Sequence, residues 1–156
     1  MKILVFDIWA DYAHFRKFYT TSSPLTFSFP PPSAIAGILG AFYGSDKNKN
    51  EYLKVFGSEV CKIALRILRP IRKVRMGINL LETKGTNFRL PMSDKHLAPR
   101  TQIRTEFIKN PAFRIYIAHQ DASIFNGLYK NISEHKSIYT ISLGLSELLA
   151  DFRYIG

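Results

Sequence analysis

The sequence predicts an α+β fold, a ferredoxin-like antiparallel sheet with helices on one face. Three observations predict it. Several short segments alternate apolar with polar residues, as strands with one buried face do. Other segments have helical spacing, and the elements follow one another as strand, helix, strands, helix, strand. With 156 residues, 46% of them hydrophobic, the chain suits a single domain with a substantial core.

The N-terminal residues predict the first strand and the first helix. Met1–Trp9 is a short apolar run typical of a buried strand. Pro30–Pro32 disfavours helix before it and predicts a rigid extended segment. Ser33 is then placed to cap a helix that continues to Tyr43. Because two glycines inside this helix cost about 1 kcal/mol each relative to alanine, we expect another backbone to lie close against it.

The next residues predict a short helix and two strands. A helical turn is expected at residues 51–56, after the polar loop 45–50. Cys61–Leu68 alternates, with apolar side chains on one face and basic or small ones on the other. Ile71–Leu81 alternates in the same way. We expect these two segments to be neighbouring strands.

A long loop and a hairpin are predicted next. Glu82–Arg100 is polar, contains glycine and prolines and has no sustained period, so it predicts a loop of the length that is usually functional or disordered. Thr101–Ile108 and Ala112–His119 predict a hairpin around the turn at residues 109–111.

The C-terminal part predicts one helix and one strand. Asp121 is a plausible N-cap for a helix that ends near Ile132. A final strand is expected at Ile138–Ser142. The Ser146 region predicts a helix start, because its sequence lacks the spacing of a nucleophile elbow.

Composition restricts the partners. The formal net charge of +10 predicts a polyanionic partner, nucleic acid before anionic membrane. Cys61 is the only cysteine, which excludes a disulfide framework and a thiolate zinc site and fits the reducing cytoplasm. Early acidic residues argue against a signal peptide, and no apolar run reaches the roughly 18 residues of a membrane span, so no membrane contact is expected.

Basic residues cluster along the two predicted neighbouring strands. No acidic residue interrupts Lys62, Arg66, Arg69, Arg72, Lys73 and Arg75. The plain alternative is a solvated sheet face. We favour a phosphate-binding surface, because alternation brings several of these charges to one face. Arg89, Lys95, Arg100 and Arg104 extend the basic character beyond it.

Aromatic residues flank a basic pair near the N-terminus. Tyr12 and Tyr19 surround Arg16 and Lys17, which would combine base stacking with phosphate contacts. Phe15 and Phe18 fit the core better. The chain lacks the aromatic signature of the common RNA-recognition motif, so stacking on the central strands is not expected.

Catalytic and cofactor signals are weak. The four histidines lack metal-ligand spacing, so neither metal nor cofactor is expected. Lys95 and His96, together with Tyr43, could run metal-free RNA cleavage, with a base acting on the ribose 2′-OH and a cation stabilising the phosphorane. The alternative is an exposed lysine beside an exposed histidine.

Three stretches resemble the CRISPR-associated RAMP superfamily, and within it the fifth Cas family of type I Cascade, most closely the type I-B variety. They are MKILVFDIWADYAHFRKFYTTSSPLTFSFPPPSAIAGILGA, the basic pair of strands, and YTISLGLSELLA. The resemblance implies a modified ferredoxin-like domain of the RAMP type, related to RRM folds, with residues 82–100 as a thumb-like loop. Members of the family usually continue past this length, so the chain is expected to be a shortened or minimal form.

The resemblance also implies a function. Such a subunit holds the 5′ handle of the CRISPR RNA (crRNA), caps the complex and contacts the backbone RAMP subunit and the large subunit. Type I-C members cut precursor RNA with tyrosine, lysine and histidine, whereas other type I members do not, so we expect a non-catalytic chain. The alternative is a metal-independent endoribonuclease acting on precursor CRISPR RNA. The expected RNA contacts are Tyr12, Arg16, Lys17, Tyr19, Lys62, Arg66, Arg72, Lys73, Arg75, Arg100 and Arg104.

Overall fold

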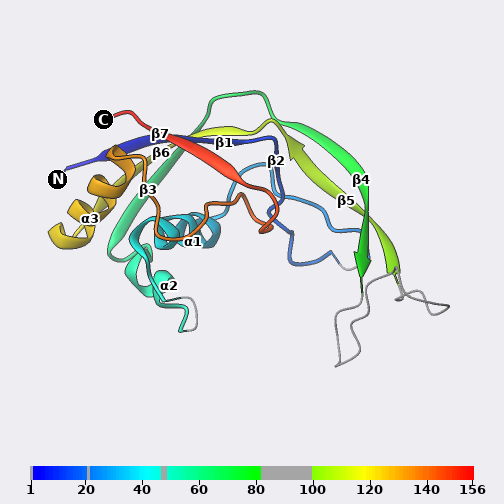
Figure 1. The fold of residues 1–156 in the computed structure, drawn as a ribbon, viewed down its shortest axis with the longest axis horizontal. Helices are drawn as coiled ribbons and strands as arrows, with labels where there is room; N and C mark the ends of the chain where they lie inside the picture. The colour runs from blue at the N-terminus through cyan, green and yellow to red at the C-terminus, as the bar shows by residue number, and fades with distance from the viewer. Residues whose placement is uncertain (1, 21, 47–48, 82–99) are drawn as a thin grey trace.

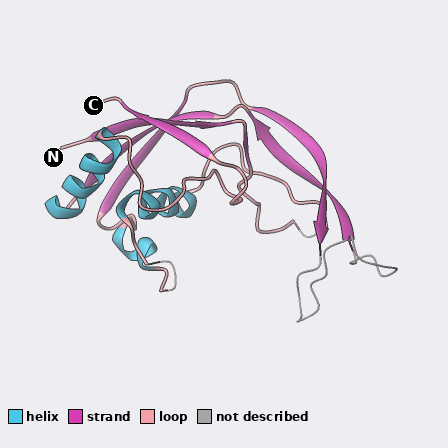
Figure 2. Ribbon diagram, in the orientation of Figure 1, coloured by secondary structure: helices cyan, strands magenta, loops and turns pink. Residues whose placement is uncertain are grey.

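The computed structural model describes residues 2–20, 22–46, 49–81 and 100–156. Its strands and helices form two antiparallel sheets with the helices gathered on one side (Figures 1 and 2). In chain order the elements are β1 (Leu4–Ala10), β2 (Tyr12–Ala13), α1 (Pro32–Tyr43), α2 (Glu51–Val55), β3 (Cys61–Ile67), β4 (Arg72–Leu81), β5 (Arg100–Lys109), β6 (Ala112–His119), α3 (Ala122–Ser133) and β7 (Ala150–Tyr154).

The larger sheet has the strand order β3-β6-β1-β7. Together with α1 and α3 it forms the βαββαβ arrangement of a ferredoxin-like fold, with every neighbouring pair antiparallel. Alternate residues of β1, such as Leu4, Phe6 and Ile8, are buried against the helices with Leu39 and Leu128. The predicted fold class is confirmed.

The smaller sheet has the order β2-β5-β4. Its strands β4 and β5 are inserted in the chain between β3 and β6, whereas β2 directly follows β1. Strands β4 and β5 pair along their whole length, from Arg72 opposite Lys109 to Leu81 opposite Arg100. Figure 1 shows this hairpin extending away from the larger sheet. The predicted loop of residues 82–100 lies outside the described residues, except that Arg100 opens β5.

Two predicted strand pairings are wrong. Residues 61–68 and 71–81 are not paired neighbours, because β3 pairs with β6 and β4 pairs with β5. Residues 101–108 and 112–119 likewise form no hairpin. The chain turns at Asn110, which has a positive φ of 49°, and passes from one sheet to the other. Local alternation predicts strands correctly but carries no information about their partners.

The helix starts differ in how well the sequence predicted them. Asp121 caps α3 as expected, and its carboxylate accepts hydrogen bonds from the backbone N–H groups of Ser123 (2.7 Å) and Ile124 (3.3 Å). Ser33 does not cap α1. The helix begins at Pro32, whose missing N–H costs nothing in the first turn.

The glycines of α1 meet a side chain, not the backbone that we expected. A Cβ on Gly40 would lie 2.7 Å from the Cβ of Tyr52 on α2. At Gly37 the nearest atom, a ring carbon of Tyr52, would be 3.8 Å away, which is an ordinary contact. Only Gly40 is therefore required for the packing of α1 on α2.

The C-terminal strand lies later than predicted. Residues 138–142 are not a strand, and Ser146 does not start a helix. Instead the backbone N–H groups of Ile138 and Tyr139 both donate to the carbonyl of Ala41 at the end of α1. Strand β7 then completes the sheet, with Phe152 facing the core.

Candidate nucleic-acid interface

The base of the β4–β5 hairpin holds a network of ions. Glu106 on β5 lies 3.1 Å from the ammonium of Lys73 and 3.6 Å from the guanidinium of Arg75, both on β4. Burial alone would raise the pKa of Glu106. Hydrogen bonds from Lys73 and the backbone of Thr26, together with the positive charges of Lys73 and Arg75, outweigh burial, so the pKa of this carboxyl is lowered.

This network ties the N-terminal loop to the hairpin. Lys73 also donates a hydrogen bond of 2.8 Å to the carbonyl of Thr26. His14 is buried, and its Nδ1 lies 2.7 Å from the carbonyl oxygen of Glu106. The ammonium of Lys73, predicted to bind phosphate, is thus already committed within the protein. Arg75 is more available, since 60% of its side chain is exposed.

A pocket of about 300 Å³ lies where the chain passes between the two sheets. It is lined by three basic residues, Arg69, Arg72 and Lys109, together with Pro70 and Asn110. Arg72 and Lys109 are cross-strand partners, and the three basic side chains belong to exposed residues. Three cations around one small cavity fit a phosphate group. We call this cavity the basic pocket.

The basic pocket contains cations that the sequence alone did not bring together. Arg72 was assigned to RNA, Arg69 was only counted in the basic cluster, and Lys109 was missed. The sequence shows that Lys109 directly follows one predicted strand and that Arg72 lies at the start of another. It does not show that the two strands pair, and only their register places Arg72 and Lys109 opposite each other.

The N-terminal loop between β2 and α1 presents exposed aromatic rings. Phe18 is 90% exposed and Tyr19 is 60% exposed, and their rings pack edge to face. The ammonium of Lys17 lies 5.7 Å from the centre of the Tyr19 ring. Arg16 donates a hydrogen bond to the carbonyl of Thr20, which shapes the loop. The expectation that Phe18 belongs to the core is wrong.

Two neighbouring aromatics are placed in the body of the protein. Phe15 is 3% exposed, as expected for a core residue. Tyr12 is half-buried, and its ring packs edge to face against Phe107 with 6.2 Å between the ring centres. The part of Tyr12 that remains exposed is the part available to a ligand.

The other predicted RNA contacts lie apart from the basic pocket. Lys62 and Arg66 project from β3 in the larger sheet, whereas Arg104 is on β5. Lys73 and Arg75 lie on the opposite face of β4 from Arg72, because strand residues alternate. We had expected the basic residues of the two segments to share one face, and this expectation is wrong.

The predicted cleavage residues are not brought together among the described residues. Lys95 and His96 lie outside them. Tyr43 ends α1 and packs against Phe56, with 6.1 Å between the ring centres.

In the described part of the chain, no three histidine, cysteine or acidic residues are grouped to hold a metal ion. No described helix is long and apolar enough to cross a membrane.

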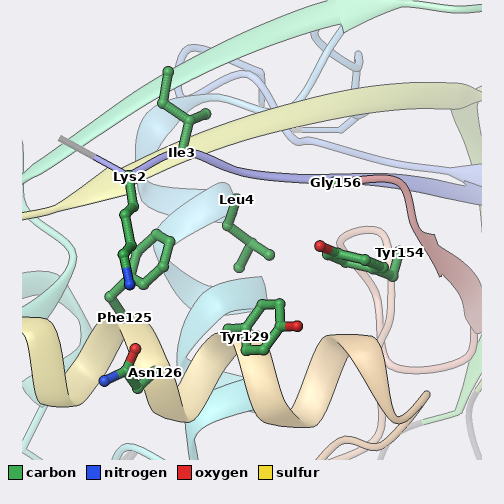
Figure 3. A pocket seen from close by; sticks show the side chains of 8 residues that line it. All are labelled: Lys2, Ile3, Leu4, Phe125, Asn126, Tyr129, Tyr154 and Gly156. Carbon is green, nitrogen blue, oxygen red and sulfur yellow. The ribbon is translucent and has the colours of Figure 1, made fainter.

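A second pocket, of about 450 Å³, lies between the start of β1 and α3. Figure 3 shows Tyr129 of α3 near Tyr154 of β7, with Lys2 and Asn126 on the other side. The two tyrosine rings pack edge to face at 5.7 Å. Among the described residues, no aspartate, glutamate or histidine side chain lines this pocket.

Comparison with known structures reveals the same fold in CRISPR proteins. One similar chain belongs to a "CRISPR RNA-guided surveillance complex" (TM-score 0.66, 12% identity, 96% of this chain and 60% of that one). Another belongs to a "CRISPR-associated Protein" (TM-score 0.55, 12% identity, 99% and 67%). A third belongs to a "Type III-B Cmr-beta bound to cognate target RNA" (TM-score 0.55, 15% identity, 97% and 59%). The present chain thus spans about 60% of the first of these.

Sequence comparison identifies the family. No curated protein matches the chain. The model of the family described as "CRISPR-associated protein (Cas_Cas5)" matches residues 3–131, which is most of the length of this chain. The match includes the N-terminal loop, the hairpin and the basic pocket. The chain is therefore a member of the Cas5 family of CRISPR-associated proteins.

Proposed function

We propose that this chain is the non-catalytic subunit that holds the 5′ handle of the crRNA in a type I CRISPR interference complex, of the I-B variety. The observation that carries the proposal is the basic pocket. Its three cations offer a site for phosphate at the base of a projecting hairpin. Family membership and the RNA-guided complexes of similar fold support it.

The phosphates and bases of the handle would meet different parts of this surface. Arg72 in the basic pocket, with Arg69 and Lys109, would bind backbone phosphate. Arg75 and Arg104 lie on the opposite face of the hairpin from Arg72 and would bind phosphate there, with Arg100 at the start of β5 as a further contact. Arg16 and Lys17 would add charge beside Tyr12, Tyr19 and Phe18, whose rings can stack on unpaired bases. Lys73 would act by positioning, because Glu106 and Thr26 hold it.

The hairpin also has a face suited to a protein partner. Val74, Met76 and Ile78 of β4 lie on one side with Ile103 of β5, and all four are only half-buried. A two-stranded arm with an apolar face gains stability by docking. We assign this face to the neighbouring backbone RAMP subunit. The large subunit would be a further neighbour.

The test is binding of a labelled CRISPR-repeat RNA in EDTA at several salt concentrations, with a scrambled RNA for comparison. We expect selective, salt-dependent binding without cleavage. Arg72→Glu with Lys109→Glu should weaken binding and reduce the salt slope by about 1.4, since each phosphate contact on a single strand contributes about 0.7. Lys54→Glu with Lys130→Glu changes net charge equally, on exposed residues of α2 and α3, and should have a smaller effect.

Two outcomes would contradict the proposal. Equal affinity and salt slope for the Arg72/Lys109 variant and the Lys54/Lys130 variant would remove the basic pocket from RNA binding. Cleavage in EDTA that His96→Ala abolishes would show instead that the chain is a metal-independent endoribonuclease.

A further inference from the structure

The face of the larger sheet opposite the helices carries a charged row. Four residues lie side by side in register across the sheet: Arg66 on β3, Arg114 on β6, Asp7 on β1 and Arg153 on β7. All four point away from the helices, because Phe6, Ile8 and their partners point towards them. We call this surface the open face (Figure 1).

The charge of this row is positive. Asp7 is 4% exposed, and its two carboxylate oxygens accept hydrogen bonds of 2.7 and 3.0 Å from Arg114. The guanidinium of Arg153 lies 3.7 Å from the same carboxylate, yet 71% of its side chain is exposed. Arg66 is exposed as well. One buried carboxylate thus neutralises one guanidinium and leaves two available.

Nearby charges do not cancel this surplus. Lys62, four residues before Arg66 on the same face of β3, is exposed, and its ammonium donates a hydrogen bond to the carbonyl of Ser58. Asp151 at the sheet edge lies 3.2 Å from a ring nitrogen of His135. The open face therefore attracts anions.

Aromatic rings lie on both sides of the charged row. Trp9 on β1 and Tyr116 on β6 belong to the two central strands and are only partly buried. The register places Ala112 and Asp151 on the two sides of Trp9, and Val5 and Ala64 on the two sides of Tyr116. Each ring is therefore the largest side chain of its row. Trp9 is four residues from Val5, so the two aromatic rows are about 13 Å apart along the strands.

This combination favours nucleic acid over a protein partner. The cores of protein interfaces are depleted of charged residues, whereas here guanidinium groups run through the middle of the face. Aromatic rings beside arginines are what unpaired bases and their phosphates require. The absence of the usual RNA-recognition signature led us to expect no stacking on the central strands. The structure nevertheless places two rings there.

We propose that the open face binds single-stranded nucleic acid, with bases stacked on Trp9 and Tyr116 and phosphates held by Arg66 and Arg153. This surface is separate from the basic pocket, and the proposal does not depend on handle binding. It assigns a second length of single strand to the same protein.

The chain provides its own probe, because Trp9 is its only tryptophan. We expect a short oligouridylate to quench the fluorescence of the full chain, since stacking brings a base onto the indole. An abasic phosphodiester of equal length should bind more weakly and leave the emission unchanged. Tyr116→Ala should weaken oligouridylate binding on the order of tenfold, with the fold checked by circular dichroism.

Charge reversals identify the surface. Arg66→Glu with Arg153→Glu should abolish the quenching, whereas the matched Lys54→Glu with Lys130→Glu should retain most of it. Arg72→Glu with Lys109→Glu should retain the quenching while losing affinity for repeat RNA, so the two proposals can fail separately.

Three results would overturn the inference. They are no quenching by any oligonucleotide, equal quenching in the Arg66/Arg153 and Lys54/Lys130 variants, and equal quenching by oligoglutamate. The last would identify the face as a site for an acidic protein.

Discussion

The carboxylate of Asp7 and the guanidinium of Arg114 form a two-pronged ion pair across the central strands of the larger sheet. The carboxylate is almost completely buried, while Arg114 keeps part of its side chain in solvent. The hydrogen bond from Arg114 is the main reason why the pKa of Asp7 is lowered, against the opposing effect of burial. This pair links the stability of the sheet to pH.

We expect Asp7→Asn to lower the free energy of unfolding at neutral pH by about 1.5 to 3 kcal/mol, the range for hydrogen bonds to charged groups. Because the folded-state pKa of Asp7 is depressed, its contribution is fully present above the unfolded value near 3.8 and is lost as pH falls through the folded pKa. Urea unfolding at several pH values measures this. The difference from the wild type should shrink in acid.

Asp11→Asn is the control for that series, because it removes an equal charge from an exposed residue of the same region. It should change stability little. A gap between Asp7→Asn and the wild type that stayed constant down to the lowest pH would contradict the assignment.

The ion network of Glu106 predicts energetic coupling. We expect Lys73→Met and Glu106→Gln to be non-additive by about 1 kcal/mol, because the carboxylate and the ammonium bond directly. A double-mutant cycle in thermal or urea unfolding measures the coupling. Lys109→Met with Glu106→Gln is the comparison pair, and it should be additive, because Lys109 faces the opposite side of β5 from Glu106. Full additivity of the Lys73 pair would show that the network contributes nothing.

Gly144 lies against the N-terminal loop in a way that excludes a side chain. Its φ is +106°, and a Cβ there would collide with the carbonyl oxygen of His14. The backbone N–H of His14 also donates to the carbonyl of Leu143, at 3.0 Å. We expect Gly144→Ala to destabilise the protein by at least about 2 kcal/mol, from the strained φ and the clash. The change in unfolding midpoint measures it.

Gly37→Ala gives the matched comparison of opposite sign. That position lies in a helix, and its Cβ would make only an ordinary contact with Tyr52. Alanine should therefore stabilise the protein by up to about 1 kcal/mol. Destabilisation by Gly37→Ala, or tolerance of Gly144→Ala, would mean that the local packing is not as described.

Cys61 predicts a reactivity pattern. Its thiol is buried, and burial raises its pKa to about 11. Since the thiolate is the reactive form, iodoacetamide at pH 8 should label the native protein very slowly and the urea-unfolded protein quickly. Mass spectrometry detects the single added group. Rapid labelling without urea would show that β3 opens readily.

The sequence predicted single elements well and their partners poorly. Alternation located β3 and β4, and Asp121 marked the start of α3 because an N-cap depends on neighbouring residues only. Pairing depends on residues far apart, so the register of β3 with β6 could not be inferred across the inserted hairpin. The last strand was misplaced although Phe152 and Tyr154 alternate with Asp151 and Arg153, a signal present in the sequence.

The candidate sites show the same limit. Arg69 and Lys109 are 40 positions apart in the chain, and only the hairpin brings them to one pocket. Arg66, Arg114 and Arg153 come from three strands and share a row through register alone. Charge composition predicted an anionic partner, but the places where charge gathers depend on the fold.

The hairpin departs from the larger sheet at β3 and returns to it at β6, two strands that are direct neighbours. The backbone N–H of Leu68 still donates to the carbonyl of Ala112, at 2.9 Å, just where the hairpin begins and ends. The two attachment points are therefore about one strand spacing apart, near 4.8 Å. A longer or shorter hairpin with ends at that spacing would leave every pairing of the larger sheet unchanged, so the reach of the arm can vary beyond the base that β2, Thr26 and His14 hold.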